Sequence, residues 1–348
     1  MHVLLGIFFH AIGGFAAGSF YIPFRKVSGW AWECYWIVSG FFSWIIMPWL
    51  IALLTVPSLL SILQSAGASD LFWTYFMGAL WGIGGLTFGL TMRYLGVSLG
   101  MAIALGFCSV FGTLIPPLYD GTFMSFLNDS SGIVMLLGVL VCVAGIAMCG
   151  WAGISKEKEM PQEQKQETIK EFNFSKGFLV AIFSGILSAC MAFGFAAGRP
   201  IAAIAIEKGV DPLWQNSAVL IVILSGGFTT NFIWSLILNI RNKSGRDYVR
   251  KDLPLLKNYF FSALAGITWY LQFMFYGMGS TKMGRFDFAS WTLHMAFIIV
   301  FSNIWGIVLH EWKGAGKKTM RLIIAGICIV ILSTVLIGAG NYFDTRTE

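Results

Sequence analysis

The sequence predicts an all-α polytopic membrane protein of about ten transmembrane helices, arranged as two inverted five-helix repeats. The first observation is composition: 57% of the residues are hydrophobic and only 11% are charged, whereas soluble domains carry about 25% charged residues. The second is that the apolar residues fall in blocks of about 20, the length that crosses roughly 30 Å of hydrocarbon. An ordinary water-soluble protein is therefore excluded.

Charged residues and clusters of proline and glycine separate these blocks, and we interpret each block as one span. The N-terminal block lacks the positively charged region of a cleaved signal peptide, so it is expected to be the first span. The expected spans cover residues 3–24, 33–55, 71–92, 96–118, 132–152, 175–197, 213–240, 255–279, 288–309 and 320–341.

A polar segment rich in lysine, glutamate and glutamine divides the spans five and five. We expect residues 154–174 to form a cytoplasmic linker between a first half, 1–153, and a second half, 175–348. Lysine and arginine gather in loops that lie on one side of the membrane, which identifies that side as cytoplasmic and places both termini in the periplasm. An odd number of spans per half gives the halves opposite orientations, as in many secondary transporters.

Several classes of function lack support in the sequence. The net charge of +6 comes from basic residues in short loops, where they set topology, so no nucleic-acid partner is expected. The six cysteines and four histidines show neither CxxC nor HExxH spacing, so no metal site and no cofactor are expected. Because no nucleophile elbow or nucleotide-binding loop is visible either, a small-solute transporter is favoured over an enzyme or an ATP-driven pump.

Polar side chains inside a span are costly unless they face a cavity or a partner, which makes them candidates for function. In the eighth span, Trp269, Gln272 and Tyr276 share one helical face. Flat rings beside an amide that donates and accepts hydrogen bonds suit a carbohydrate. These three are candidate substrate-binding residues, although an interfacial aromatic belt also explains the rings.

The start of the ninth span carries polar residues on one face. A carboxylate partly removed from water beside a histidine can exchange a proton near neutral pH, so Asp287 and His294 are the candidate proton-coupling residues. Capping of the helix N-terminus is the alternative role of Asp287. Ser290 and Trp291 lie on the same face and are candidate substrate-binding residues.

Four more residues are candidates, each with a structural alternative. His10 in the first span is predicted to contact the substrate, although a buried histidine can simply hydrogen-bond a neighbouring helix. Arg199, at the outer end of the sixth span, can bind a solute hydroxyl or pair with Asp287, or can extend to the membrane surface. Glu33 and Arg93, near the cytoplasmic face, are predicted to form gating or structural ion pairs.

Several motifs spread from the first span to the last resemble one known family. They are residues 6–10 (GIFFH), 20–27 (FYIPFRKV), 30–33 (WAWE), 80–84 (LWGIG), 90–96 (LTMRYLG), 269–273 (WYLQF) and 290–295 (SWTLHM). These motifs are similar to those of the bacterial L-rhamnose/proton symporter family of the drug/metabolite transporter superfamily. Arg199 in place of a lysine, a shorter loop before Asp287 and a more charged linker depart from the family pattern.

The resemblance implies a ten-helix inverted-repeat fold in the bacterial inner membrane. It also implies uptake of L-rhamnose, or a close relative such as L-lyxose, with protons as the coupling ion and no cofactor. Export of a small metabolite or drug, and sugar sensing without transport, remain alternatives, although no sizeable output domain supports a sensor. The oligomeric state is left open, and sodium coupling is too, because backbone carbonyls that bind Na⁺ leave no sequence signature.

Overall fold

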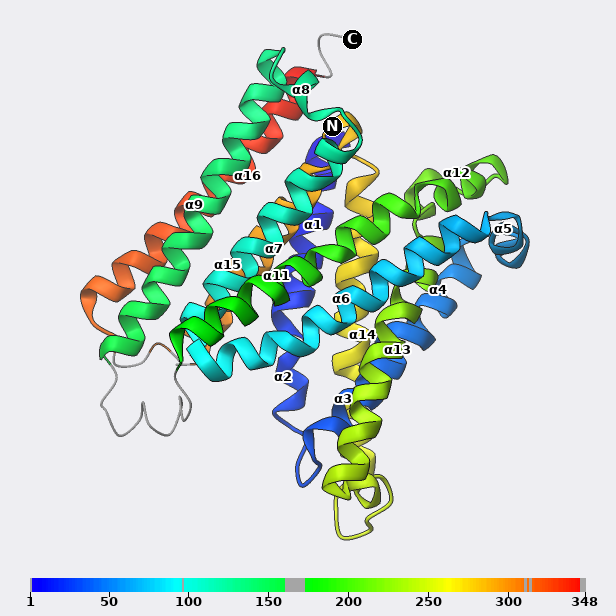
Figure 1. Cartoon of the computed structure of the whole chain (residues 1–348), viewed down its shortest axis with the longest axis vertical. Coiled ribbons are helices and arrows are strands. Elements are labelled where there is room, and N and C mark those ends of the chain that lie inside the picture. The colour runs from blue at the N-terminus through cyan, green and yellow to red at the C-terminus, as the bar shows by residue number, and fades with distance from the viewer. Residues whose placement is uncertain (1, 96, 160–172, 310–311, 313–314, 345–348) are drawn as a thin grey trace. The chain divides into compact units, whose positions relative to one another are not determined.

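The computed structural model describes residues 2–95, 97–159, 173–309, 312 and 315–344. Every regular element in these ranges is a helix (Figure 1), so the predicted all-α fold is confirmed. Among the described residues, eight helices are long and apolar enough to cross a membrane. The fourth expected span, 96–118, is represented only by the apolar helix Ile103–Tyr119, which is shorter than a full crossing, and no candidate span covers the eighth expected span, 255–279. The count of ten therefore stays a prediction.

The long helices follow the expected spans, with ends that differ by a few residues. They are α1 (His2–Ser19), α6 (Ala68–Leu95), α7 (Val97–Tyr119), α9 (Ser130–Glu159), α11 (Phe174–Ala197), α13 (Ser217–Asn242), α14 (Leu255–Ser280), α15 (Ala289–Val308) and α16 (Lys317–Asp344). The short elements are α2 (Tyr21–Phe24), α5 (Leu59–Ser65), α8 (Phe123–Phe126), α12 (Arg199–Glu207), η2 (Pro212–Trp214), η3 (Ser244–Tyr248) and η4 (Gly284–Phe286). Helix α9 continues into the segment predicted as a linker, and residues 160–172 of that segment lie outside the described residues.

The second expected span is composite. It begins as α3 (Trp32–Gly40), widens into the π-helical η1 (Phe41–Ile46) and ends as α4 (Met47–Thr55). Pro48 explains the change, because proline has no N–H to donate and its ring collides with the carbonyl four residues earlier. Wide π-helical turns of this kind are frequent at functional sites.

The chain divides into two compact units, which are described separately. The first unit takes its described residues from 1–14, 84–192 and 279–348, and the second consists of 15–83 and 193–278. Each unit therefore contains helices from before and after the central linker. Within the first unit α9 and α16 lie side by side (Figure 1), and α7 packs on α9 and α15. Within the second, α13 packs on α3, η1 and α4.

Glycine allows close approach of two helices in the second unit. A Cβ on Gly78 of α6 would overlap the carbonyl oxygen of Ile223 in α13, and one on Gly226 would overlap the carbonyl oxygen of Tyr75. Small residues at such crossings let helix backbones pack tightly in a membrane.

Loops predicted to lie on the same side of the membrane meet within each unit. In the second unit, the Ala31 N–H donates to the Asp247 carboxylate at 2.9 Å. In the first unit, the Gly316 N–H donates to Glu159 at 2.6 Å. Within each unit, two segments that the sequence analysis assigns to the same side of the membrane therefore lie together.

Candidate functional site

Two histidines from distant parts of the sequence meet inside the first unit. The rings of His10 on α1 and His294 on α15 have centroids 6.1 Å apart and cross at 63°. Both side chains are buried, with exposed fractions of 0% and 2%. Gly279 of α14 makes room for them, because a Cβ at this position would lie 2.8 Å from Cε1 and Nε2 of His10. Three helices therefore surround a pair of titratable rings.

The rest of α15 near this pair is polar but contacts a different helix. The Trp291 indole N–H donates to the Cys108 carbonyl oxygen of α7 at 2.9 Å, and the Thr292 hydroxyl hydrogen-bonds that of Thr113 on α7. The Ser290 hydroxyl is fully buried and has no hydrogen-bond partner among the described residues. Helix α15 thus presents His294 to α1 and Trp291 to α7.

Asp287 precedes α15 and is partly buried. The helix begins at Ala289 with Phe288 in the N-cap position, so Asp287 precedes the capping position by one residue. Seven positions separate Asp287 from His294, which is about 10 Å of helix. A proton exchange between these two residues stays a prediction.

Tryptophans gather in the second unit around Trp269 of α14. Its ring centroid lies 5.0 Å from that of Trp36, 5.6 Å from that of Trp44 and 4.1 Å from that of Phe20. Trp81 of α6 joins the cluster at 6.1 Å from Trp44. Most of these rings meet edge to face, an arrangement that aromatic pairs favour. The cluster of these five residues, called the tryptophan cluster below, presents several flat apolar faces within one unit.

Polar groups of this region fall into two sets. One set is satisfied: the Trp36 indole donates to Asn231 Oδ1 at 3.0 Å, and Asn231 Nδ2 donates to the Gly227 carbonyl at 2.9 Å. The other is not, because the indole N–H groups of Trp44 and Trp269 are buried without a hydrogen-bond partner among the described residues. Since an unsatisfied buried donor costs about 1–3 kcal/mol, these groups favour a ligand that accepts hydrogen bonds.

The other two predicted residues of the eighth span are buried. Gln272 follows Trp269 by one turn and is 7% exposed. Tyr276 is 6% exposed, and its ring lies 4.8 Å from that of Phe195. The predicted face of α14 therefore points into the second unit.

The remaining predicted residues lie at the ends of helices. Glu33 is buried and accepts hydrogen bonds from the Ser244 hydroxyl and, at 3.0 Å, from the Asn242 amide. Arg199 is exposed as the first residue of α12. The backbone of Arg93 belongs to α6, but its side chain lies outside the described part of the structure.

Sequence reasoning missed the residues that surround Trp269. Trp36, Trp44 and Trp81 were not predicted as site residues, because the sequence around a tryptophan in an apolar span does not show whether the side chain packs against other helices or binds a ligand. Asn231 did offer a signal, since it is an amide within the expected span 213–240, and polar residues inside spans are costly.

Comparisons with known proteins agree with this chemistry. Residues 1–342 match the family model for the L-rhamnose-proton symport protein. An L-rhamnose-proton symporter of Mannheimia succiniciproducens is 40% identical over 344 residues, which is 97% of this chain and 98% of the relative. The L-rhamnose-proton symporters of Citrobacter koseri and Escherichia coli are each 38% identical over 342 residues, with the same coverage.

Proposed function

The chain belongs to the L-rhamnose-proton symport protein family, and we propose that it imports L-rhamnose together with protons. The observation that carries this proposal is the match over 97% of the chain to relatives named L-rhamnose-proton symporters. The match to the family model confirms the family that the sequence motifs resemble. The protein is a multi-pass membrane transporter and not an enzyme.

We place the transporter in the bacterial inner membrane with both termini in the periplasm, working by alternating access between two inverted repeats. The composition of the units supports the repeat. Helices α9 and α16, five spans apart, both belong to the first unit, and α6 and α14, also five spans apart, are each divided between the units. Inverted repeats of one ancestral bundle would give such pairs.

The sugar site is proposed at the tryptophan cluster. A pyranose ring has an apolar face that stacks on an indole and a rim of hydroxyls that takes up hydrogen bonds. Trp269 supplies a face, and the buried indole N–H groups of Trp44 and Trp269 supply donors for sugar oxygens. Gln272 offers both a donor and an acceptor one turn away. Tyr276, Ser290, Trp291 and Arg199 stay candidates for further contacts.

The proton site is proposed at His10 and His294. Imidazole is the side chain whose protonation changes nearest to physiological pH, and two buried rings 6.1 Å apart would repel each other if both were charged. One proton per pair is therefore the favoured loaded state. Asp287 is retained as the carboxylate that would deliver the proton to α15. No cofactor is needed, since the proton is the coupling ion.

Uptake of radiolabelled L-rhamnose into proteoliposomes tests the proposal. With sodium absent, an inward proton gradient should drive accumulation above the external concentration, and a proton ionophore should abolish it. Tight vesicles that show no L-rhamnose uptake would contradict the assignment. Sugar counterflow that is faster outward than inward would correct the proposed direction. Counterflow that is faster with L-lyxose than with L-rhamnose would correct the proposed substrate.

A further inference from the structure

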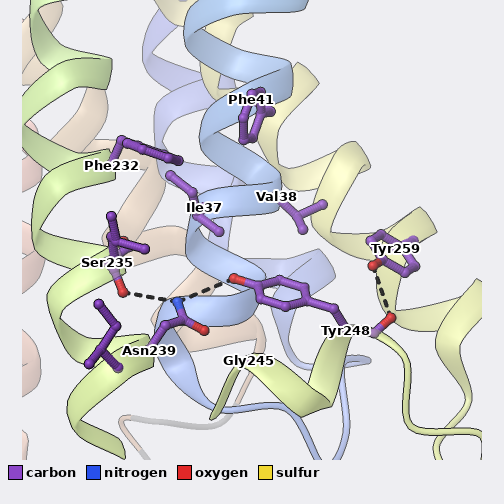
Figure 2. A pocket seen from close by; sticks show the side chains of 11 residues that line it. Ile37, Val38, Phe41, Phe232, Ser235, Asn239, Gly245, Tyr248 and Tyr259 are labelled. Atoms are coloured by element: carbon purple, nitrogen blue, oxygen red, sulfur yellow. Dashed lines mark hydrogen bonds between the residues drawn. The ribbon is translucent and has the colours of Figure 1, made fainter. Parts of the chain in front are cut away.

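An apolar groove of about 480 Å³ runs along the second unit, near the basic loop that joins α13 to α14 (Figure 2). Its walls come from the α3–η1 segment, α13, η3 and α14. The apolar lining includes Ile37, Phe41, Phe232, Leu236, Ile240 and Tyr259. The volume lies in the range of about 300–1,000 Å³ found for small-molecule sites.

The polar groups in this groove already have partners inside the protein. Asn239 Nδ2 donates to the Ser235 carbonyl at 2.9 Å and to the Tyr248 hydroxyl at 3.3 Å, and the Tyr259 hydroxyl donates to the Tyr248 carbonyl at 3.0 Å (Figure 2). Among the described lining residues, the Ser235 hydroxyl alone is buried without a hydrogen-bond partner. One hydroxyl is too little for a sugar, whose rim needs several partners, so the groove suits an apolar occupant.

The walls of the groove are exposed on membrane-spanning helices. Phe41 is 42% exposed, Leu236 48% and Ile240 71%. Large apolar side chains that protrude from such helices are in contact with lipid, because water is excluded from the hydrocarbon core. An acyl chain therefore has direct access to the groove.

One end of the groove is rich in positive charge. The last turn of α13, the connection that follows it and the first turn of α14 carry six exposed cationic side chains: Arg241, Lys243, Arg246, Arg250, Lys251 and Lys257. The two carboxylates among them are occupied, since Asp252 binds Arg250 at 2.7 Å and Asp247 accepts the Ala31 N–H at 2.9 Å. Within the described residues, the other five cations form no salt bridge. A negatively charged group is the complement of this end.

We propose that the groove binds an anionic phospholipid, with one acyl chain between α3 and α13 and its phosphate on the basic turn around Lys243 and Arg246. An anionic headgroup gains about 1 kcal/mol for each lysine or arginine near the surface, whereas a zwitterionic lipid gains little. The bound lipid would hold η3 in place, and through the Ser244 hydroxyl it would support the buried Glu33.

Native mass spectrometry of the detergent-purified protein, titrated with phosphatidylglycerol or phosphatidylcholine, tests this. The wild-type protein should retain one phosphatidylglycerol molecule more tightly than phosphatidylcholine. The double variant Lys243→Gln/Arg246→Gln should bind phosphatidylglycerol roughly 30-fold more weakly, from two lost headgroup contacts. Leu236→Trp should fill the groove and weaken both lipids.

Matched variants in the first unit serve as controls. Lys317→Gln/Lys318→Gln removes two exposed cations at the start of α16, and Leu332→Trp enlarges an apolar side chain that is 54% exposed; both should bind lipid as the wild type does. Equal affinity for the two lipids, equal effects of groove and control variants, or displacement of the lipid by L-rhamnose would overturn the proposal. Because no sugar is needed to measure lipid affinity, a failure here is separate from a failure of L-rhamnose uptake.

Discussion

The histidine pair of the first unit and the tryptophan cluster of the second differ in the side chains that they bring together. Glycine makes room in the first: Gly279 leaves space for the ring of His10, and Gly112 leaves space for the indole of Trp291. Large rings fill space in the second, where Asn231 joins α3 to α13 through the indole of Trp36. Close helices isolate a titratable group from water, whereas a cluster of aromatic rings offers flat surfaces to a ligand. The first region suits a proton and the second suits a sugar.

The largest expected effect comes from substituting one residue in each region, because the two substitutions should impair transport in different ways. In His294→Gln, proton-driven accumulation of L-rhamnose should fall to a ratio of about one, because the histidine pair that couples the proton to the sugar is broken, while sugar counterflow should persist. In Trp269→Ala, both activities should fall roughly tenfold or more, because the ring that stacks on the sugar is gone. Accumulation and counterflow in the same proteoliposomes measure the difference.

Two outcomes would contradict this division of labour. If the His294→Gln protein still accumulates L-rhamnose against its concentration gradient, the histidine pair has no role in proton coupling. If the Trp269→Ala protein shows normal sugar counterflow, the tryptophan cluster does not bind the sugar. Loss of both activities in His294→Gln, with the protein folded, would mean that the sugar itself contacts the pair.

A second substitution sharpens the assignment of the sugar site to the second unit. Gln272→Ala should raise the KM for L-rhamnose roughly tenfold to hundredfold, since a sugar hydroxyl would lose its partner in a buried site. Thr268→Ala is the control on the same helix, because the Thr268 hydroxyl donates to the Leu264 carbonyl of its own helix at 2.8 Å. Initial uptake rates over a range of L-rhamnose concentrations give both KM values. Equal KM values in the two variants would exclude Gln272 from the site.

The two regions also differ in how far the sequence could predict them. Apolar blocks and loop charges predicted the helices, because the bilayer sets their length and their orientation. His10 and His294 were both singled out as costly polar residues within spans. Their partnership was not, since helical periodicity gives the face of a residue and not the helix that it meets. Seven positions link Asp287 to His294 in the sequence, but the ring beside His294 comes from α1.

The tryptophan cluster was less accessible to sequence reasoning. Trp269 and Gln272 were found because an amide among rings is unusual, but Trp36, Trp44 and Trp81 resemble ordinary packing residues. Their roles depend on which spans are neighbours, a property of tertiary structure. The π-helical η1 likewise depends on Pro48, and a proline in the sequence does not reveal that the helix around it forms a wide turn. Chemistry carried by one helix was predicted, and chemistry assembled from several was not.

Packing around the histidine pair offers a smaller effect. Gly279→Ala puts a Cβ 2.8 Å from two ring atoms of His10, so the ring must move, at a cost of about 1–3 kcal/mol. Thermal unfolding in detergent should show this loss even though alanine is the better helix former, and proton-driven accumulation should fall more than counterflow. Gly85→Ala is the control, because no atom of the described residues lies within 4 Å of its added Cβ. Equal behaviour of the two variants would show that the pair tolerates displacement.

The smallest effect concerns the contact between the end of α9 and the start of α16 in the first unit. Glu159 accepts the Gly316 N–H at 2.6 Å and the Thr319 hydroxyl at 2.7 Å, at the N-terminus of α16, where a negative charge is stabilising. These hydrogen bonds, first that of Gly316 and then that of Thr319, lower the pKa of Glu159 from its ordinary value of 4.5. The stability that the carboxylate adds is therefore fully present above that value and is lost as pH falls through the lowered pKa.

Glu159→Gln should consequently lower the thermal unfolding midpoint slightly at pH 7, and the difference from wild type should disappear once the pH falls below the lowered pKa of Glu159. Glu207→Gln, which removes an exposed carboxylate of the second unit, should leave the midpoint unchanged at both pH values. A Glu159→Gln difference that stays constant with pH would mean that the carboxylate stabilises α9 and α16 through its shape and not through its charge. Because this contact lies outside both proposed sites, L-rhamnose accumulation per folded molecule should be unchanged, which separates the stability of the first unit from the coupling performed within it.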